Sequence, residues 1–187
     1  MELMLNGTQG GTMFTKTTVL AIGLAGALAA TGAIAQTKQA DKDSQKFIKA
    51  AIQGDIAEVD VGKLAQEKGQ SDAVKQYGAM LVKDHGEHKS KAEQVAGQLG
   101  VEPPTGSSLV QKATYAKLKM LSGAMFDRSF AKSMVKDHAD DIKEYKKEAS
   151  KKDAAGRLAS ETLPTLQHHL KTAQSLEKQT TQKQSSR

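Results

Sequence analysis

Apolar and small side chains recur every three or four positions along four long segments of the chain, which is the period of an α-helix with one buried face. Serine or aspartate opens each segment and glycine ends two of them, as expected of helix caps. Four long helices are predicted. The first begins at Asp43 or Ser44 and ends at Lys68, and the second begins at Ser71 and ends at Leu99. The third runs from about 123 to 150, and the fourth runs from Asp153 to about 178.

The connections between these segments predict how the helices pair. About two residues join the first two helices, which makes them an antiparallel hairpin. A loop with two prolines, GVEPPTGSS, and a short helix over 109–121 then lead to the second hairpin. Such a long crossover is typical of ferritin-like folds, so the predicted fold is an all-α, ferritin-like four-helix bundle with a short extra helix between helices 2 and 3. The abundance of Ala, Lys, Gln, Leu and Glu agrees with a helical protein.

The first 35 residues have the pattern of a secretory signal peptide. Lys16 precedes the apolar stretch VLAIGLAGALAA, and the following Ala33-Ile34-Ala35 has the small-x-small form of a cleavage site. We therefore expect cleavage after Ala35, no transmembrane segment after cleavage, and a periplasmic or otherwise exported protein; the alternative is an uncleaved N-terminal anchor. The polar residues before Lys16 favour translation from Met13. The other expected boundaries are a polar leader over 36–42, the bundle over 43–178 and a disordered polar tail over 179–187.

Charge and composition exclude several classes of function. The formal net charge is +6, but the lysines alternate with acidic residues, as in KEYKKEASKKD, and few arginines or aromatic residues accompany them. This pattern argues against nucleic-acid binding and allows only weak association with an anionic cell-envelope surface. The absence of cysteine from the sequence excludes disulfides, thiol catalysis and cysteine-ligated metals.

Ionisable side chains stand in the inward stripes where apolar residues are expected. They are Glu58 in the first helix, His85 and His88 in the second, Asp127 and His138 in the third, and His169 in the fourth. Glu58, His85, His138 and His169 each lie within about three residues of the midpoint of their helix, and the midpoints of antiparallel helices share one level of a bundle. Imidazole and carboxylate groups gathered in one layer would suit Fe, Mn or Zn. Alternatively, the same groups hydrogen-bond to one another and only hold the helices in register.

Two further aspartates adjoin the histidines in the repeated tetrapeptide VKDH. Asp84 precedes His85 and Asp137 precedes His138. Each lies about 100° around its helix from the inward stripe, so the pattern predicts that both are solvated.

Three segments of the chain resemble a bacterial family of exported proteins that carries a domain of unknown function and whose members are often described as outer-membrane proteins. They are FIKAAIQGDIAEVDVGKLAQEKGQSDAVKQYGAMLVKDH, LSGAMFDRSFAKSMVKDH and LPTLQHHL. The resemblance extends from about Ser44 to Leu176 and implies a ferritin-like fold. It also implies recurrent polar positions at Glu58, His85, Asp127, His138 and His169. The Glu-x-x-His pairs of di-iron proteins are not matched, which favours a single-metal site over a carboxylate-bridged pair.

Three functions follow from these observations. The first is an exported bundle that binds a transition metal through Glu58, His85, His138 and His169, with Asp127 or His88 as an additional ligand, and that buffers metal or removes oxidants. The second is a structural or stress-protective envelope protein whose polar layer only fixes helix register. The third is an enzyme, whose activity would have to come from the metal, because the sequence contains no nucleophile–base motif, phosphate loop or dinucleotide fingerprint.

Overall fold

The computed structural model describes residues 41–185, and this part of the chain is helical without a strand. Its five helices are α1 (Lys42–Lys68), α2 (Asp72–Gln98), α3 (Leu109–Lys119), α4 (Gly123–Ala149) and α5 (Ala154–Ser185). The all-α prediction is thus confirmed for the described residues, and the bounds of the predicted helices agree to within a few residues except at the end of α5. The predicted signal peptide and most of the leader lie outside the described residues.

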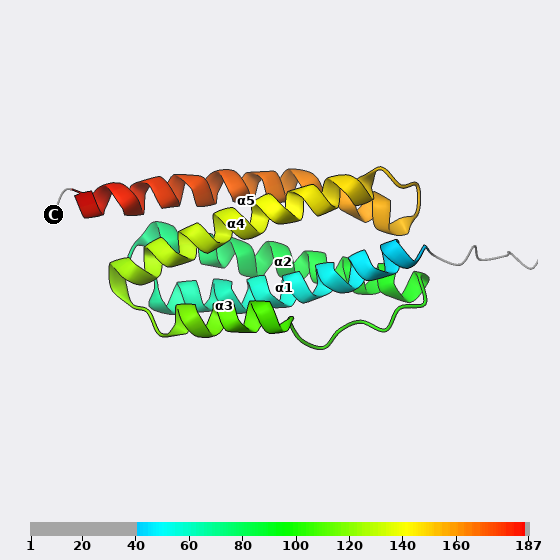
Figure 1. The fold of residues 1–187 in the computed structure, drawn as a ribbon, viewed down its shortest axis with the longest axis horizontal. Coiled ribbons are helices and arrows are strands. Elements are labelled where there is room, and N and C mark those ends of the chain that lie inside the picture. Colours follow the sequence, from blue (N-terminus) through cyan, green and yellow to red (C-terminus); the bar gives the residue numbers. More distant parts are fainter. Residues whose placement is uncertain (1–40, 186–187) are drawn as a thin grey trace, which may run out of the picture. The chain divides into compact units, whose positions relative to one another are not determined.

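Two antiparallel hairpins form the bundle, α1 with α2 and α4 with α5 (Figure 1). Helix α2 ends in a left-handed turn at Gly100, where φ is 65° and glycine is favoured. The chain then returns along the bundle through a loop and α3, so that α4 begins beside the α1–α2 turn (Figure 1). Helix α2 therefore packs against α5, and α1 against α4. The predicted long crossover with its short helix is present.

The caps explain where two of the helices begin. Asp41, rather than Asp43 or Ser44, caps α1, because its carboxylate accepts a hydrogen bond from the Asp43 N–H at 3.2 Å. Ser44 is instead fully buried and donates to the Asp153 carboxylate at 2.7 Å. Asp153 also accepts from the Gly156 N–H at 2.8 Å, as predicted for the cap of the last helix. One carboxylate thus caps α5 and joins it to the start of α1.

Helices α1 and α2 approach each other most closely at a pair of glycines. A β-carbon built on Gly78 would lie 2.6 Å from the Gly62 carbonyl oxygen, and one built on Gly62 would lie 2.7 Å from the Gly78 carbonyl oxygen. Real β-carbons do not approach so closely, so this contact requires glycine on both helices. The close approach brings the middle of α1 within hydrogen-bonding distance of α2.

Apolar side chains fill the bundle core at both ends. One cluster, near the α1–α2 turn, contains Tyr77, Phe126 and Phe130, and the other end contains Ile48, Ile52 and Leu158. The buried ionisable residues Asp55, Glu58, His85, His88, His138 and His169 come from the helix segments between these two ends, whereas the buried Asp127 and Glu148 lie near the ends of α4. The polar layer is therefore surrounded by apolar packing, which weakens its contact with bulk water.

The end of the chain differs from the expectation. The disordered tail was predicted over 179–187, but α5 continues to Ser185. Gln and Lys in this segment are good helix formers, and the Thr180 and Thr181 hydroxyls donate to carbonyls one turn earlier at 2.9 and 2.8 Å. Among the described helices, none combines the length and apolar character needed to cross a membrane.

Candidate metal centre

Three buried histidines from three helices meet in the polar layer. His85 comes from α2, His138 from α4 and His169 from α5, and each is at most 5% exposed. One ring nitrogen of each lies within 4.8 Å of the corresponding nitrogens of the other two. The ring centroids are 5.2–5.7 Å apart. This spacing is suitable for three imidazoles around one metal ion.

The second ring nitrogen of each of these histidines forms a hydrogen bond with an oxygen atom. His85 Nδ1 lies 2.9 Å from an Asp55 carboxylate oxygen, and His138 Nδ1 lies 3.0 Å from the Met134 carbonyl oxygen. His169 Nε2 lies 2.9 Å from an Asp84 carboxylate oxygen. Carboxylate and carbonyl oxygens only accept, so each of these three nitrogens must carry the proton. Metal-binding histidines are commonly oriented in this way.

The nitrogens that remain in the neutral rings therefore carry lone pairs. His138 Nε2 faces His169 Nδ1 at 3.2 Å, and with the protons placed on the outer nitrogens no hydrogen lies between them. His85 Nε2 is buried and finds no hydrogen-bond partner among the residues that the structure describes. Lone pairs that converge in a buried site are unfavourable unless a cation shares them.

A proton is a poor cation for this position. Burial, together with repulsion from positive charge on the neighbouring His85 and His169, lowers the pKa of His138 to about 3. Burial also lowers the pKa of His169, against the opposing effect of the Asp84 carboxylate. His138 and His169 are therefore neutral at neutral pH, which is the state that binds a metal ion.

Asp55 binds two histidines of α2 at once. Its second carboxylate oxygen accepts from His88 Nδ1 at 2.7 Å, while the first accepts from His85. Asp55 is 2% exposed and His88 is 8% exposed. His88 therefore lies beside the cluster rather than in it, and its Nε2 has no partner among the described side chains. The carboxylate fixes both imidazole rings from α1.

The prediction that Asp84 is solvated is wrong. It reaches from α2 to α5, where it accepts the hydrogen bond of His169, and its side chain is only 25% exposed. Helix α2 packs against both α1 and α5, so it buries two faces, and the sequence stripe marks only one of them. Asp137 is also partly buried, and burial raises its pKa.

Asp127 is not part of the cluster. Its two carboxylate oxygens accept from the Gln70 and Ser71 backbone N–H groups at 2.8 and 3.0 Å. These donors belong to the α1–α2 turn, and Asp127 precedes His138 by eleven residues of α4, a rise of about 16 Å. The structure thus makes Asp127 a cap of the turn, in place of the predicted metal ligand.

Glu58 lies in the bundle, 6% exposed, but is not among the groups that converge with the histidines. One of its carboxylate oxygens is buried and has no hydrogen-bond partner in the described part of the chain. Burial, followed by repulsion from Asp141, Asp137 and Asp55, raises the pKa of Glu58 well above its ordinary value. Glu58 lines a cavity between α1, α3 and α4.

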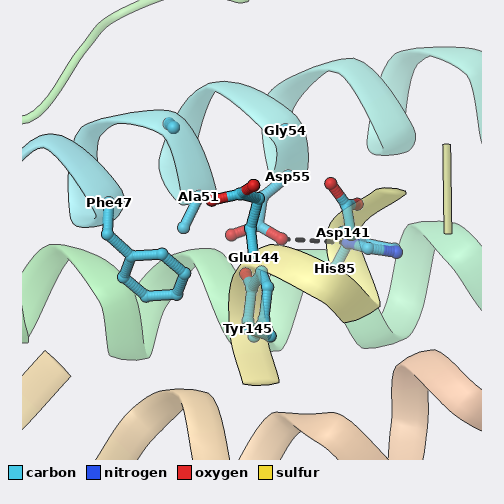
Figure 2. Close-up of a pocket in the computed structure, with 9 residues that line it drawn as sticks. Phe47, Ala51, Gly54, Asp55, His85, Asp141, Glu144 and Tyr145 are labelled. Atoms are coloured by element: carbon cyan, nitrogen blue, oxygen red, sulfur yellow. Dashed lines mark hydrogen bonds and ion pairs between the residues drawn. The ribbon is translucent and has the colours of Figure 1, made fainter. Parts of the chain in front are cut away.

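A small cavity of about 80 Å³ reaches His85 from the side of α1 and α4. Figure 2 shows Asp55, His85 and Asp141 along it, with the hydrogen bond from His85 to Asp55 marked. Burial raises the pKa of Asp141 to about 6, although His85 nearby lowers it. Solvent and small ions can therefore approach the cluster past a carboxylate.

Comparison with known proteins gives the family of this chain. A family model described as a domain of unknown function, DUF4142, matches residues 29–176. The chain belongs to the DUF4142 family. A solved structure, the crystal structure of a DUF305 fragment from Deinococcus radiodurans, is similar at a TM-score of 0.67 and 18% identity, covering 75% of this chain and 98% of that one. At this identity the likeness concerns the fold alone. No curated protein matches the chain.

In this DUF4142 chain, the sequence pattern did not predict two residues that support the site. They are Asp55, which binds His85 and His88, and Asp84, which binds His169. Asp55 lies three residues, about one helical turn, before Glu58 of the predicted inward stripe, so a wider stripe would have included it. Asp84 carried no such signal, because its partner lies on another hairpin.

Proposed function

We propose that this protein is an exported, ferritin-like helical bundle that binds a transition-metal ion through His85, His138 and His169. The observation that supports this most strongly is the convergence of three unprotonated imidazole nitrogens in a buried layer. Each ring is held by an acceptor behind it, so little reorganisation is needed to bind a cation.

The donor set indicates which metals fit. Three neutral imidazoles suit zinc, iron, copper or nickel, whereas manganese prefers oxygen ligands. Within the predicted set of Fe, Mn and Zn, the cluster therefore favours zinc or iron. Three protein ligands leave a coordination position open to water or another small ligand. A bundle of this kind is suited to buffer metal in the envelope or, with iron, to remove oxidants.

The helix connectivity and the N-terminal sequence support the other two parts of the proposal, the ferritin-like fold and export. The crossover that returns along the bundle has the connectivity typical of ferritin-like folds. The apolar stretch and the small-x-small site before residue 36 support export.

Elemental analysis tests this function. The protein comprising residues 36–187 is purified from the periplasm without a histidine tag, beside the double variant His85→Ala/His138→Ala. The control is His168→Ala, since this exposed histidine adjoins His169 and lies outside the cluster. We expect about one equivalent of zinc or iron in the parent and the control, and little in the double variant. Equal metal content in all three would contradict the assignment.

A structural role of the same layer is the second candidate. Asp55 joins α1 to α2 through two hydrogen bonds, and the hydrogen bond from His169 to Asp84 joins α5 to α2. Such bonds would hold the helices in register in an envelope protein that binds no metal. Metal-free protein whose thermal melt does not respond to added zinc or iron would favour this role.

A further inference from the structure

A second cavity lies between α1, α3 and α4, on the side of Glu58. Its volume is about 190 Å³, and Val110 and Gln111 of the crossover helix form part of its wall. Val110 is 77% exposed, so the cavity opens to the surface at this wall. Glu58 and Asp141 line it from α1 and α4.

The cavity is acidic. Of the described residues that line it, Glu58, Asp137, Asp140 and Asp141 carry carboxylates and Lys136 carries a positive charge. Lys136 binds Asp140 at 2.8 Å, and Lys143 binds the other Asp140 oxygen at 2.8 Å. Within the described residues, Glu58 and Asp141 form no ion pair. The carboxylates of Glu58 and Asp141 therefore have no paired lysine in this part of the chain, whereas the carboxylate of Asp140 has two.

Glu58 points to a ligand in this cavity. The residue is only 6% exposed, and one of its carboxylate oxygens is buried without a hydrogen-bond partner in the described structure. Leaving such an oxygen unsatisfied is unfavourable, and more so if it is charged. Glu58 lines the adjoining cavity, so a cation bound there by its carboxylate would reduce the repulsion between Glu58 and Asp141.

We propose that Glu58 and Asp141 form a second cation subsite, which takes a hard divalent ion such as Mn²⁺ beside the three-histidine site. Carboxylate and water oxygens are the ligands that such ions prefer, and a cavity of about 190 Å³ has room for the waters that they retain. Asp141 also lies along the smaller cavity that reaches His85 (Figure 2). The subsite thus adjoins the histidine cluster, and the inference deepens the proposed function by adding an oxygen-ligand site to it.

Two metal probes separate this subsite from the histidine cluster. Mn²⁺ binding is followed by loss of the free-ion EPR signal, and Co²⁺ binding by its visible absorption, which reports nitrogen ligation. Both are measured on the parent, on Glu58→Gln/Asp141→Asn and on His85→Ala/His138→Ala. The matched control is Asp60→Asn/Glu67→Gln, which makes the same two changes at exposed positions of α1.

We expect Glu58→Gln/Asp141→Asn to bind Mn²⁺ at least about tenfold more weakly while its Co²⁺ band stays unchanged. The control should match the parent in both. Mn²⁺ binding that is equal in the parent and in Glu58→Gln/Asp141→Asn, or absent from the parent, would overturn the subsite. Absence of a Co²⁺ band from the parent would instead contradict the histidine site. Gln and Asn keep the side-chain volumes, and thermal melting checks folding; the single Asp141→Asn variant repeats the comparison if the double variant does not fold.

Discussion

Two glycines of α2 should respond in opposite directions to the same substitution. Gly78 faces α1, where an added β-carbon would lie 2.6 Å from the Gly62 carbonyl oxygen and 2.8 Å from the Ala65 β-carbon. Gly86, two turns further along α2, would place its β-carbon in space with nothing within 4 Å. Both lie inside the helix, so the gain in helix propensity on changing glycine to alanine is the same.

The magnitudes follow from this geometry. The contact at Gly78 falls about 0.8 Å short of the 3.4 Å at which ordinary van der Waals contact begins, and a backbone atom cannot move aside alone. Overpacking of this kind costs about 1–3 kcal/mol, against a propensity gain of about 1 kcal/mol. We therefore expect Gly78→Ala to lower the free energy of unfolding by up to about 2 kcal/mol and Gly86→Ala to raise it by about 1 kcal/mol.

Urea denaturation of the metal-free protein, followed by circular dichroism at 222 nm, measures both changes at constant m-value. In Gly78→Ala the added β-carbon should also push α1 away from α2. This displacement should lengthen the contact between Asp55 and His85 and weaken metal binding, whereas Gly86→Ala should leave both unchanged. If the two variants change stability in the same direction, the close approach of α1 and α2 at Gly78 is wrong.

Three other changes test the site and its supports. Asp127→Ala removes the acceptor of two backbone N–H groups, so it should cost about 1–3 kcal/mol in thermal melts while metal content stays unchanged; a loss of metal without a loss of stability would restore it as a ligand. Asp84→Ala removes the acceptor behind His169 and should weaken zinc binding about 10–100-fold in a chelator competition; unchanged affinity would show that this hydrogen bond does not support the site. The folded protein holds His138 at a pKa of about 3, against the usual 6.5 of the unfolded chain, so the neutral ring's contribution is fully present above pH 6.5 and is lost as pH falls toward 3. The stability difference between parent and His138→Leu should therefore shrink by about 1.4 kcal/mol per pH unit below pH 6 in urea titrations; a difference that is constant with pH would refute the burial of a neutral ring.

The helical period predicted most of the fold and the core of the site. The stripes were narrow, but they placed His85, His138 and His169 inward at one level, and the structure brings these three together. The capping and turn residues likewise predicted the two hairpins and the crossover. These features follow from local sequence, since propensity, caps and period act within a few turns of one helix.

The supports of the site depend on how the helices rotate against each other, which the period does not fix. Asp55 binds both α2 histidines because the Gly62–Gly78 contact brings α1 close, and this contact joins two helices. Asp84 turns to α5 because α2 has a second buried face. The position of Asp127 along α4 could have excluded it from the site, since a rise of about 16 Å separates it from His138.

X-ray absorption spectroscopy of the zinc-loaded protein tests metal binding by the three histidines most directly. With one equivalent of zinc, the account predicts three imidazole nitrogens at about 2.0–2.1 Å, visible through their multiple scattering, and one further light atom. His169→Ala should lower the imidazole count, and His168→Ala should not. A zinc environment made only of oxygen atoms, or one that is the same in both variants, would contradict the three-histidine site.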